Sequence, residues 1–417
     1  MSPTPSGPPP PTTVPESVAV AGAGLAATQT VAALREAGYT GRVVVLGAEG
    51  VPPYDRPPLS KHLLDRVTPA WLADEVGTDI TALADEVHLD RPARGLVVHG
   101  AGVTVHTDHG DLTADAVVVA TGAHAHRPDG WAGASTLHTA ADAEQLRAAL
   151  RPGDRLVVVG AGWIGAEVAG VAARADVDVT VVEAAPAPLA AALGPQVGAL
   201  TTPWYDEHGV RLLTGRQVAA VDGAGVRLAD GTTLRADVVL AAVGARPATA
   251  WLGASLPREP DGALRVDEGF AVLGAPRHVR AVGDVTLRRS RRHGWVPGGH
   301  WDGALRDPTE LVADLLHPGA TAARADRAPY VFSTQLGHEL TLFGQPGADD
   351  DVVLRGDPAA GAGWTALWYR PGTDALAAVL TVDRPRDVGA ARRLFTTPDL
   401  PVLPRTRAAD PALPLRA

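Results

Sequence analysis

The chain has 417 residues, of which 46% are hydrophobic and 20% charged, with a formal net charge of −10. This length allows two or three globular domains, and the negative charge argues against nucleic acid or an anionic membrane as the main partner. The chain contains no cysteine. Thiol nucleophiles, redox disulfides and cysteine-held iron–sulfur clusters are therefore excluded, and any redox chemistry requires a bound cofactor.

The N-terminal segment 1–15 is rich in proline and is predicted to be a disordered tail. It has neither the basic start nor the apolar core of a secretory signal, and no run of about 18 apolar residues predicts a membrane helix. These features favour a cytoplasmic protein. The histidines do not show metal-ligand spacing, so no metal site is expected.

The first chemical signal is a strand–turn–helix–strand pattern near the N-terminus. The short apolar run Ser17 to Ala21 leads into a G-x-G-x-x-A turn at 22–27, an alanine-rich helix and a second buried strand, Arg42 to Leu46, with Glu49 after it. In such a βαβ unit the glycines allow a tight turn and the close approach of a pyrophosphate, which the N-terminus of the helix attracts. The pattern predicts a dinucleotide site.

A second unit repeats the first. A strand at 154–159 runs into G-A-G-W-I-G at 160–165, a helix to about 175, and a strand at 177–182 that ends at Glu183. An acid at this place binds the ribose diol, and no arginine or lysine follows it until Arg211. The pattern therefore favours NADH over NADPH.

Three later segments continue a parallel-sheet pattern. Each is an apolar strand that runs into glycine: Ala116 into Thr121-Gly122, Val238 into Gly244, and Val279 into Gly283-Asp284. An aspartate after such a strand can accept hydrogen bonds from the ribityl hydroxyls of a flavin, although an ordinary helix cap is the alternative. Two dinucleotide units in one chain are most simply explained by hydride transfer from one dinucleotide to the other.

The motifs GAGLAA, PYDRPPLSK, ATG, GAGWIGAE, VGARP, AVGD and GHW, in this order, resemble the FAD-dependent pyridine nucleotide oxidoreductases. The most similar branch is that of the ferredoxin and rubredoxin reductases of bacterial P450 and ring-hydroxylating oxygenase systems. The resemblance implies an α/β fold with two Rossmann-like domains and a C-terminal α+β domain. It places FAD on 16–125 and 250–325, NADH on 126–249, and the C-terminal domain at 326–417.

The resemblance also assigns residues to the two dinucleotides. The residues that it places at FAD are Gly22, Gly24, Leu25, Ala26, Glu49, Arg56, Lys61, Arg94, Ala120, Thr121, Gly122, Gly283, Asp284 and Trp301. The residues that it places at NADH are Gly160, Gly162, Ile164, Gly165, Glu183 and Gly244. It gives a catalytic part to Lys61, beside the flavin N5 edge, and to its partner Glu167. Lys61 is the only lysine of the chain.

The chain also departs from the family pattern. Gly299 stands where many relatives have the glutamate of E-H-W, Thr334 stands where they have the aspartate of W-S-D-Q, and the usual arginine-proline after ATG is replaced by AHAHR at 123–127. We expect these changes to affect the geometry of NADH and the choice of acceptor more than the binding of FAD.

The function implied is an NADH-dependent FAD reductase that passes electrons to a ferredoxin-like iron–sulfur protein, as a monomer or homodimer, without a nucleic-acid or membrane partner. Two alternatives stay open: a flavin oxidoreductase acting on a small molecule, and a flavoprotein that senses NADH with little turnover. Four arginines in the run 288–292 are either a solvated loop or a docking patch for an acidic ferredoxin.

Overall fold

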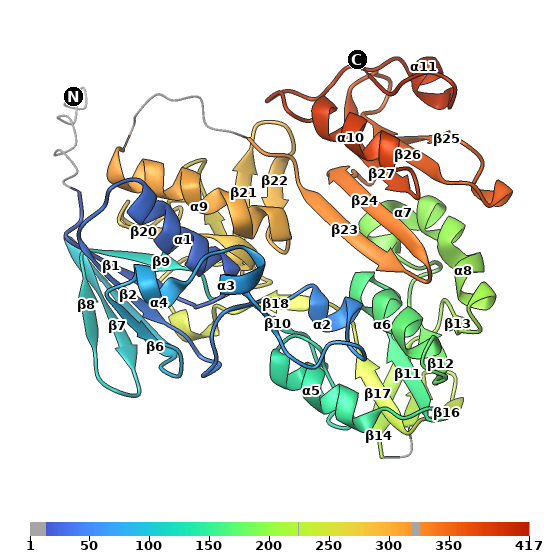
Figure 1. Ribbon diagram of the computed structural model, residues 1–417, viewed down its shortest axis with the longest axis horizontal. Helices are drawn as coiled ribbons and strands as arrows, with labels where there is room; N and C mark the ends of the chain where they lie inside the picture. The colour runs from blue at the N-terminus through green and yellow to red at the C-terminus, as the bar shows by residue number, and fades with distance from the viewer. Residues whose placement is uncertain (1–13, 224, 319–325, 417) are drawn as a thin grey trace, which may run out of the picture.

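The computed structural model describes residues 14–223, 225–318 and 326–416. The predicted disordered tail, apart from its last two residues, lies outside the described residues. Figure 1 shows two groups of elements side by side at the level of the parallel sheets, with a third group above the second one. The α/β class predicted from the sequence is confirmed, as is the C-terminal α+β part.

The first group is built on a parallel sheet of five strands in the order β20-β9-β1-β2-β5. Its inner strands consist of small and β-branched residues that are almost completely buried, which suits a sheet covered on both faces. Helix α1 packs against α9, although the two are far apart in sequence. The bounds are β1 Ser17–Ala21, β2 Arg42–Leu46, β5 Glu86–His88, β9 Ala116–Val119, β20 Val279–Ala281, α1 Leu25–Glu36 and α9 Trp301–Leu316.

The chain therefore leaves the first sheet after β9 and returns to it with β20. An antiparallel sheet of β6, β7 and β8 precedes β9 in the chain. A second small sheet, in which β21 pairs parallel with β19 and antiparallel with β22, is formed by the strands before and after β20. The bounds are β6 Ala93–His99, β7 Gly102–Thr107, β8 Leu112–Ala114, β19 Leu264–Val266, β21 Thr286–Ser290 and β22 Gly294–Pro297.

The second group lies between these two visits. Its parallel sheet has the order β13-β12-β11-β17, and α6 follows β11 directly. The short strands β10 and β18 pair antiparallel where the chain enters and leaves this group. The bounds are β10 Ala123–Ala125, α5 Ala140–Ala149, β11 Arg155–Val159, α6 Trp163–Ala173, β12 Asp178–Val182, β13 Arg211–Leu213, β17 Val238–Ala241 and β18 Ala245–Pro247.

The third group is an antiparallel sheet in the order β23-β24-β27-β26-β25 (Figure 1). Helix α10 contacts β24 and β27, and α11 contacts β25. β26 and β27 are buried along their whole length, because one face packs with the second group and the other with α10. The bounds are β23 Tyr330–Gln335, β24 His338–Gly344, β25 Asp351–Arg355, β26 Trp364–Tyr369, β27 Leu376–Val382, α10 Pro385–Leu394 and α11 Arg405–Ala409.

Candidate functional site

The first glycine loop joins β1 to α1. Gly22 has φ 118°, and a Cβ atom there would lie 2.1 Å from the carbonyl oxygen of Ala120, so only glycine fits. At Gly24 a Cβ atom would meet nothing within 4 Å. Gly24 is also the N-cap of α1 and supplies no side-chain cap, so the first N–H groups of the helix, from Leu25 and Ala26, point to an open approach.

The second glycine loop, between β11 and α6, has the same construction. A Cβ atom at Gly160 would lie 2.4 Å from the carbonyl oxygen of Ala242, whereas Gly162 has open space. Gly165 is required for packing, since its Cβ atom would lie 2.0 Å from the Gly160 carbonyl oxygen. Ile164, 42% exposed, stands on the first turn of α6. Both loops thus expose one glycine backbone, and both fit a pyrophosphate.

Glu183 follows β12 beside the second loop. Its carboxylate accepts hydrogen bonds from the backbone N–H groups of Ala161 and Ala185, both at 2.7 Å. These bonds hold an anion next to the loop. Gly244, with φ 105° and nothing within 4 Å of a Cβ atom, follows β17 in the same sheet.

A polar cluster lies after β2 in the first group. The guanidinium of Arg56 donates to Glu49 at 2.6 Å and to the carbonyl oxygen of His138 at 2.5 Å, and the hydroxyl of Tyr54 donates to Glu49 as well. The structure thus joins two predicted site residues, Glu49 and Arg56, in one ion pair. Arg94 is not joined to them: it pairs with Asp108 on the three-stranded sheet, and its side chain is 58% exposed.

The ATG and GD segments meet the first glycine loop. Ala120 and Thr121 lie against Gly22, Gly122 has φ 71°, and a Cβ atom at Gly283 would lie 3.0 Å from the Cβ atom of Ala26. Asp284 accepts from the Gly299 N–H at 3.2 Å, and burial raises the pKa of its carboxyl group. The predicted FAD residues of the first glycine loop, the ATG segment and the GD segment therefore meet at the ends of β1, β9 and β20.

Trp301 begins α9 and is tied to the PYDRPPLSK segment. Its indole N–H donates to Asp55 at 2.6 Å, and its ring meets Phe332 edge-on at a centroid distance of 5.9 Å. Burial raises the pKa of Asp55. This bond fixes the start of α9 relative to the segment that carries Lys61.

The sequence analysis gave a catalytic part to Lys61 and its partner Glu167, and the structure brings these two residues together. Lys61 ends the short helix α2 (Pro58–Lys61), and Glu167 lies on α6 and is 6% exposed. The ammonium donates to Oε1 of Glu167, and its Nζ atom lies 5.1 Å from the centroid of the Phe332 ring. The pair is therefore a contact between the first and second groups.

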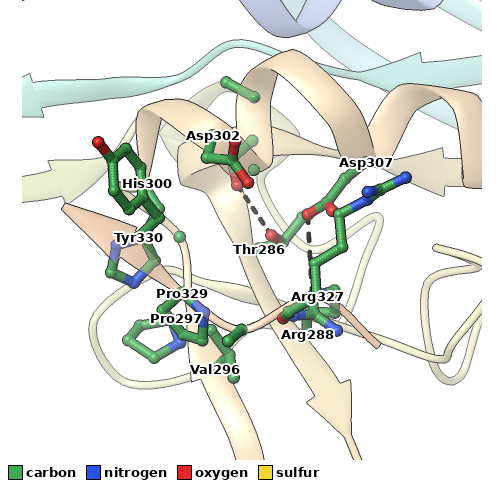
Figure 2. A pocket seen from close by; sticks show the side chains of 16 residues that line it. Thr286, Arg288, Val296, Pro297, His300, Asp302, Asp307, Arg327, Pro329 and Tyr330 are labelled. Atoms are coloured by element: carbon green, nitrogen blue, oxygen red, sulfur yellow. Dashed lines mark hydrogen bonds and ion pairs between the residues drawn. The ribbon is translucent and has the colours of Figure 1, made fainter. Parts of the chain in front are cut away.

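Next to the start of α9 lies a small polar cavity of about 30 Å³, shown in Figure 2. Arg288 on β21 points towards Asp307 on α9, with 3.8 Å between Nε and Oδ2. Burial raises the pKa of Asp307 to about 6 and lowers the pKa of His300 to about 4. His300 is thus a neutral imidazole near neutral pH, and its Nδ1 atom has no partner among the described residues.

The interpretation of 288–292 as a docking patch is wrong for two of its four arginines. Arg288 and Arg292 are 9% and 7% exposed. Arg288 pairs with Asp326 at 3.0 Å, and Arg292 donates to the carbonyl oxygens of Phe395, Asp326 and Thr397. Arg288 on β21 and Arg292 in the turn after it both face the C-terminal part, whereas Arg289 and Arg291 remain exposed.

Sequence reasoning missed three side chains that complete the Lys61 site: Ser60, Ser333 and Gln335. Ser60 and Ser333 donate to Glu167, and Gln335 donates to Ser333. A strand period of two places Ser333 and Gln335 on one face of β23. This alternation can be read from the sequence, but the sequence does not show which face of β23 packs against α6.

Comparisons with known proteins agree with this geometry. The model of the family described as pyridine nucleotide-disulphide oxidoreductase matches residues 16–303, and the one described as reductase C-terminal matches 330–417. The anthranilate 1,2-dioxygenase system ferredoxin–NAD(+) reductase component of Burkholderia cepacia is 33% identical, over 95% of this chain and 98% of that protein.

Two solved structures are similar along most of their length. The crystal structure of Fdr9 is 38% identical, with a TM-score of 0.82, over 93% of this chain and 99% of that one. The reductase in the covalent putidaredoxin reductase–putidaredoxin complex is 27% identical, with a TM-score of 0.83, over 91% and 93% of the two chains.

The described ranges contain neither a membrane-spanning helix nor a cluster of metal ligands. Within 14–223, 225–318 and 326–416, no helix has the length and apolarity needed to cross a membrane. Over the same ranges no group of three acidic or histidine side chains could hold a metal ion.

The chain has two glycine loops, each followed by an acidic residue, and the family model matches most of the length of the chain. The chain therefore belongs to the pyridine nucleotide-disulphide oxidoreductase family.

Proposed function

We propose that this protein is an NADH-dependent FAD reductase that delivers electrons to a small ferredoxin-like iron–sulfur protein. The observation that carries the proposal is the pair between Lys61 and Glu167, which joins the PYDRPPLSK segment to the helix of the second glycine loop. A cation at this junction lies where two dinucleotides, one on each loop, would bring their reactive rings together. The relative from Burkholderia cepacia is named as a ferredoxin–NAD(+) reductase component, and the solved complex joins putidaredoxin reductase to putidaredoxin.

The residues of the first loop fit FAD. The open backbone at Gly24 and the uncapped start of α1 would hold its pyrophosphate. Glu49 would lie at its adenosine ribose, its partner Arg56 would contact the flavin side, and Asp284 would accept from its ribityl hydroxyls. When bound, FAD supplies an acceptor for the hydride of NADH and a donor of single electrons. We assign 16–125 and 250–325 to this cofactor.

The residues of the second loop fit NADH, and we assign 126–249 to it. Gly162 would admit the pyrophosphate, and Glu183 would bind the ribose diol and repel the 2′-phosphate of NADPH. Lys61 would stabilise the negative charge that arrives with the hydride, since a preorganised cation acts strongly in a site that excludes water. No proton transfer by a side chain is required, so the part played by the chain is orientation and electrostatics.

The acceptor is the second half of the proposal. The chain has no cysteine and therefore no disulfide of its own to reduce, so electrons must leave to another molecule. An NADH-dependent reductase acts in the compartment that supplies NADH. We therefore propose that the protein is cytoplasmic.

Steady-state assays with two acceptors test this function. Ferricyanide accepts electrons from any accessible reduced flavin, whereas a ferredoxin coupled to cytochrome c requires a protein acceptor. We expect turnover with both. Turnover with ferricyanide alone, for every ferredoxin tried, would instead support an oxidoreductase of small molecules, and very slow reduction with either would support an NADH sensor.

A further inference from the structure

Glu167 is the point at which three separate parts of the chain meet. Lys61 and Ser60 reach it from α2, Ser333 reaches it from β23, and Glu167 itself stands on α6. Ser60 donates to Oε2 at 2.5 Å, and Ser333 donates to Oε1 at 2.5 Å. The carboxylate therefore accepts from one ammonium and two hydroxyls. Hydrogen bonds to a charged group are stronger than neutral ones.

The direction of these bonds is fixed by their neighbours. Gln335, 1% exposed, donates from Nε2 to the hydroxyl oxygen of Ser333 at 3.1 Å. A hydroxyl has a single hydrogen, so accepting from Gln335 leaves that hydrogen for Glu167. Among the described residues, the hydroxyl of Ser60 has one other acceptor, the Pro57 carbonyl oxygen at 3.3 Å, which is farther away than the carboxylate. Both serines are thus held as donors to Glu167.

The ammonium of Lys61 is only partly used by the protein. It donates to Glu167 and, at 3.4 Å, to the carbonyl oxygen of Phe332. An ammonium carries three N–H groups, and the hydrogen bonds of the described residues give the third one no acceptor. This group is available to a bound cofactor. Its effect there depends on how much of its charge the nearby carboxylate cancels.

We propose that Ser60 and Ser333 are positioning residues, which act on Lys61 through Glu167. Their hydroxyl dipoles point positive ends at the carboxylate and reduce its pull on the ammonium, so that more of the cationic field remains for the reduced flavin. Because Ser333 belongs to β23, the C-terminal part of the chain helps to set the reduction potential of FAD. This inference rests on the proposed function for the placing of Lys61 beside the flavin.

The strand offers a matched control. Thr334 follows Ser333 directly, but its side chain is on the opposite face of β23 and donates to Glu339 at 2.9 Å. Ser333→Ala and Thr334→Ala each remove a hydroxyl from β23, one residue apart. Only the first removes a donor from Glu167. A general loosening of the strand would affect both variants, whereas the proposed role affects one.

The experiment compares holoenzyme variants by the midpoint potential of FAD, titrated with dithionite and a reference dye, and by the rate of flavin reduction in stopped flow. Ser333→Ala should lower the potential and slow reduction at saturating NADH by about tenfold, as expected for one lost hydrogen bond to a charged group. The NADH concentration for half-maximal rate should not change. Thr334→Ala should match the wild type, and Ser333→Thr, which keeps a hydroxyl, should recover most of the loss.

A double-mutant cycle shows whether Ser333 acts through Glu167. In a Glu167→Gln background, Ser333→Ala should have little further effect on the potential. A wild-type potential and rate in Ser333→Ala would overturn the proposal, as would an equal loss in Thr334→Ala or an undiminished effect in the Glu167→Gln background. If Ser333→Ala does not retain FAD, Ser60→Ala makes the same test from α2.

The two proposals fail in different ways. The dithionite titration requires neither NADH nor a ferredoxin, so it reports on the serines even if the wild type is not reduced by NADH. Absence of reduction by NADH in the wild type would contradict the proposed function alone. Normal reduction with unchanged potentials in the serine variants would contradict the positioning role alone.

Discussion

Lys61 stands alone as a lysine among 37 basic residues, and its surroundings explain the choice. The ammonium is small enough to face Glu167, the Phe332 carbonyl oxygen and the Phe332 ring together. A guanidinium is planar, larger and spreads its charge over three nitrogens, so it cannot make the same compact set of contacts. A buried cation also needs its counter-charge, because removing one partner of such a pair costs about 3–5 kcal/mol.

Replacing Lys61 by arginine should therefore preserve FAD binding but impair its reduction. The positive charge is kept, so the Glu167 carboxylate still has a partner, but the charge moves away from the flavin edge. We expect flavin reduction by NADH to slow by about tenfold or more and the flavin potential to fall. Stopped-flow absorbance under anaerobic conditions measures the rate. Hydride transfer at the wild-type rate in Lys61→Arg would refute the role given to the ammonium.

We expect another single residue, Glu183, to decide the choice between NADH and NADPH. Glu183→Ala combined with Ala184→Arg removes the anion and adds a cation for a 2′-phosphate, so the preference for NADH should narrow by about tenfold or reverse. The comparison is kcat/KM for NADH and NADPH. Glu183 also holds two backbone N–H groups, one on each carboxylate oxygen, and Glu183→Gln, which keeps the side-chain shape but can accept from only one of them, shows how much the loss of these bonds disturbs the loop. A wild type that prefers NADPH would contradict this interpretation.

At the scale of elements, β21 shows how a charge run can mislead. Four arginines in five positions suggested one solvated or docking surface, but a strand sends successive side chains to opposite faces. Arg288 on β21 points away from its exposed neighbour Arg289, and Arg292 lies in the turn after the strand. Both anchor the C-terminal part, through Asp326 and the carbonyl oxygens after α10. The sequence shows the cluster of positive charge, but it does not show that the C-terminal part of the chain buries two of the four arginines.

Arg292→Ala should destabilise the protein, whereas Arg291→Ala should not. Arg292 satisfies several carbonyl oxygens at a buried interface, and leaving them without a donor should lower the free energy of unfolding by about 3 kcal/mol. Arg291 is exposed, so its replacement by alanine should change the free energy of unfolding by less than about 0.5 kcal/mol. Urea unfolding of both variants makes the comparison. Equal stabilities would mean that Arg292 does not anchor the C-terminal part.

The parallel strands and glycine turns were the most predictable elements. Strands such as Ser17–Ala21 and Arg42–Leu46 appear with the bounds expected, because a run of buried small and β-branched residues followed by glycine has few other structures available. The Ser60–Glu167–Ser333 contacts could not be predicted in this way. They depend on the docking of three segments that are more than a hundred residues apart, and no local pattern encodes that docking.

At the scale of the whole molecule, the chain visits the first sheet twice and encloses the second group between the visits. The antiparallel pair of β10 and β18 marks both crossings. The C-terminal sheet then packs on α6, so that β23 reaches the junction between the two dinucleotide loops. Motif order was sufficient to predict this class of fold. Two of the three residues that complete the site, Ser333 and Gln335, came from the part of the chain with the weakest motifs.

The central claim is that NADH reduces a flavin held by this chain and that a protein then takes the electrons. An anaerobic titration of the purified holoprotein with NADH, followed in the flavin absorbance bands, tests it most directly. Bleaching should be complete near one equivalent of NADH, and the bands should recover when an oxidised ferredoxin is added. A preparation without flavin absorbance, bands that NADH does not bleach, or bleached bands that no ferredoxin restores would contradict it.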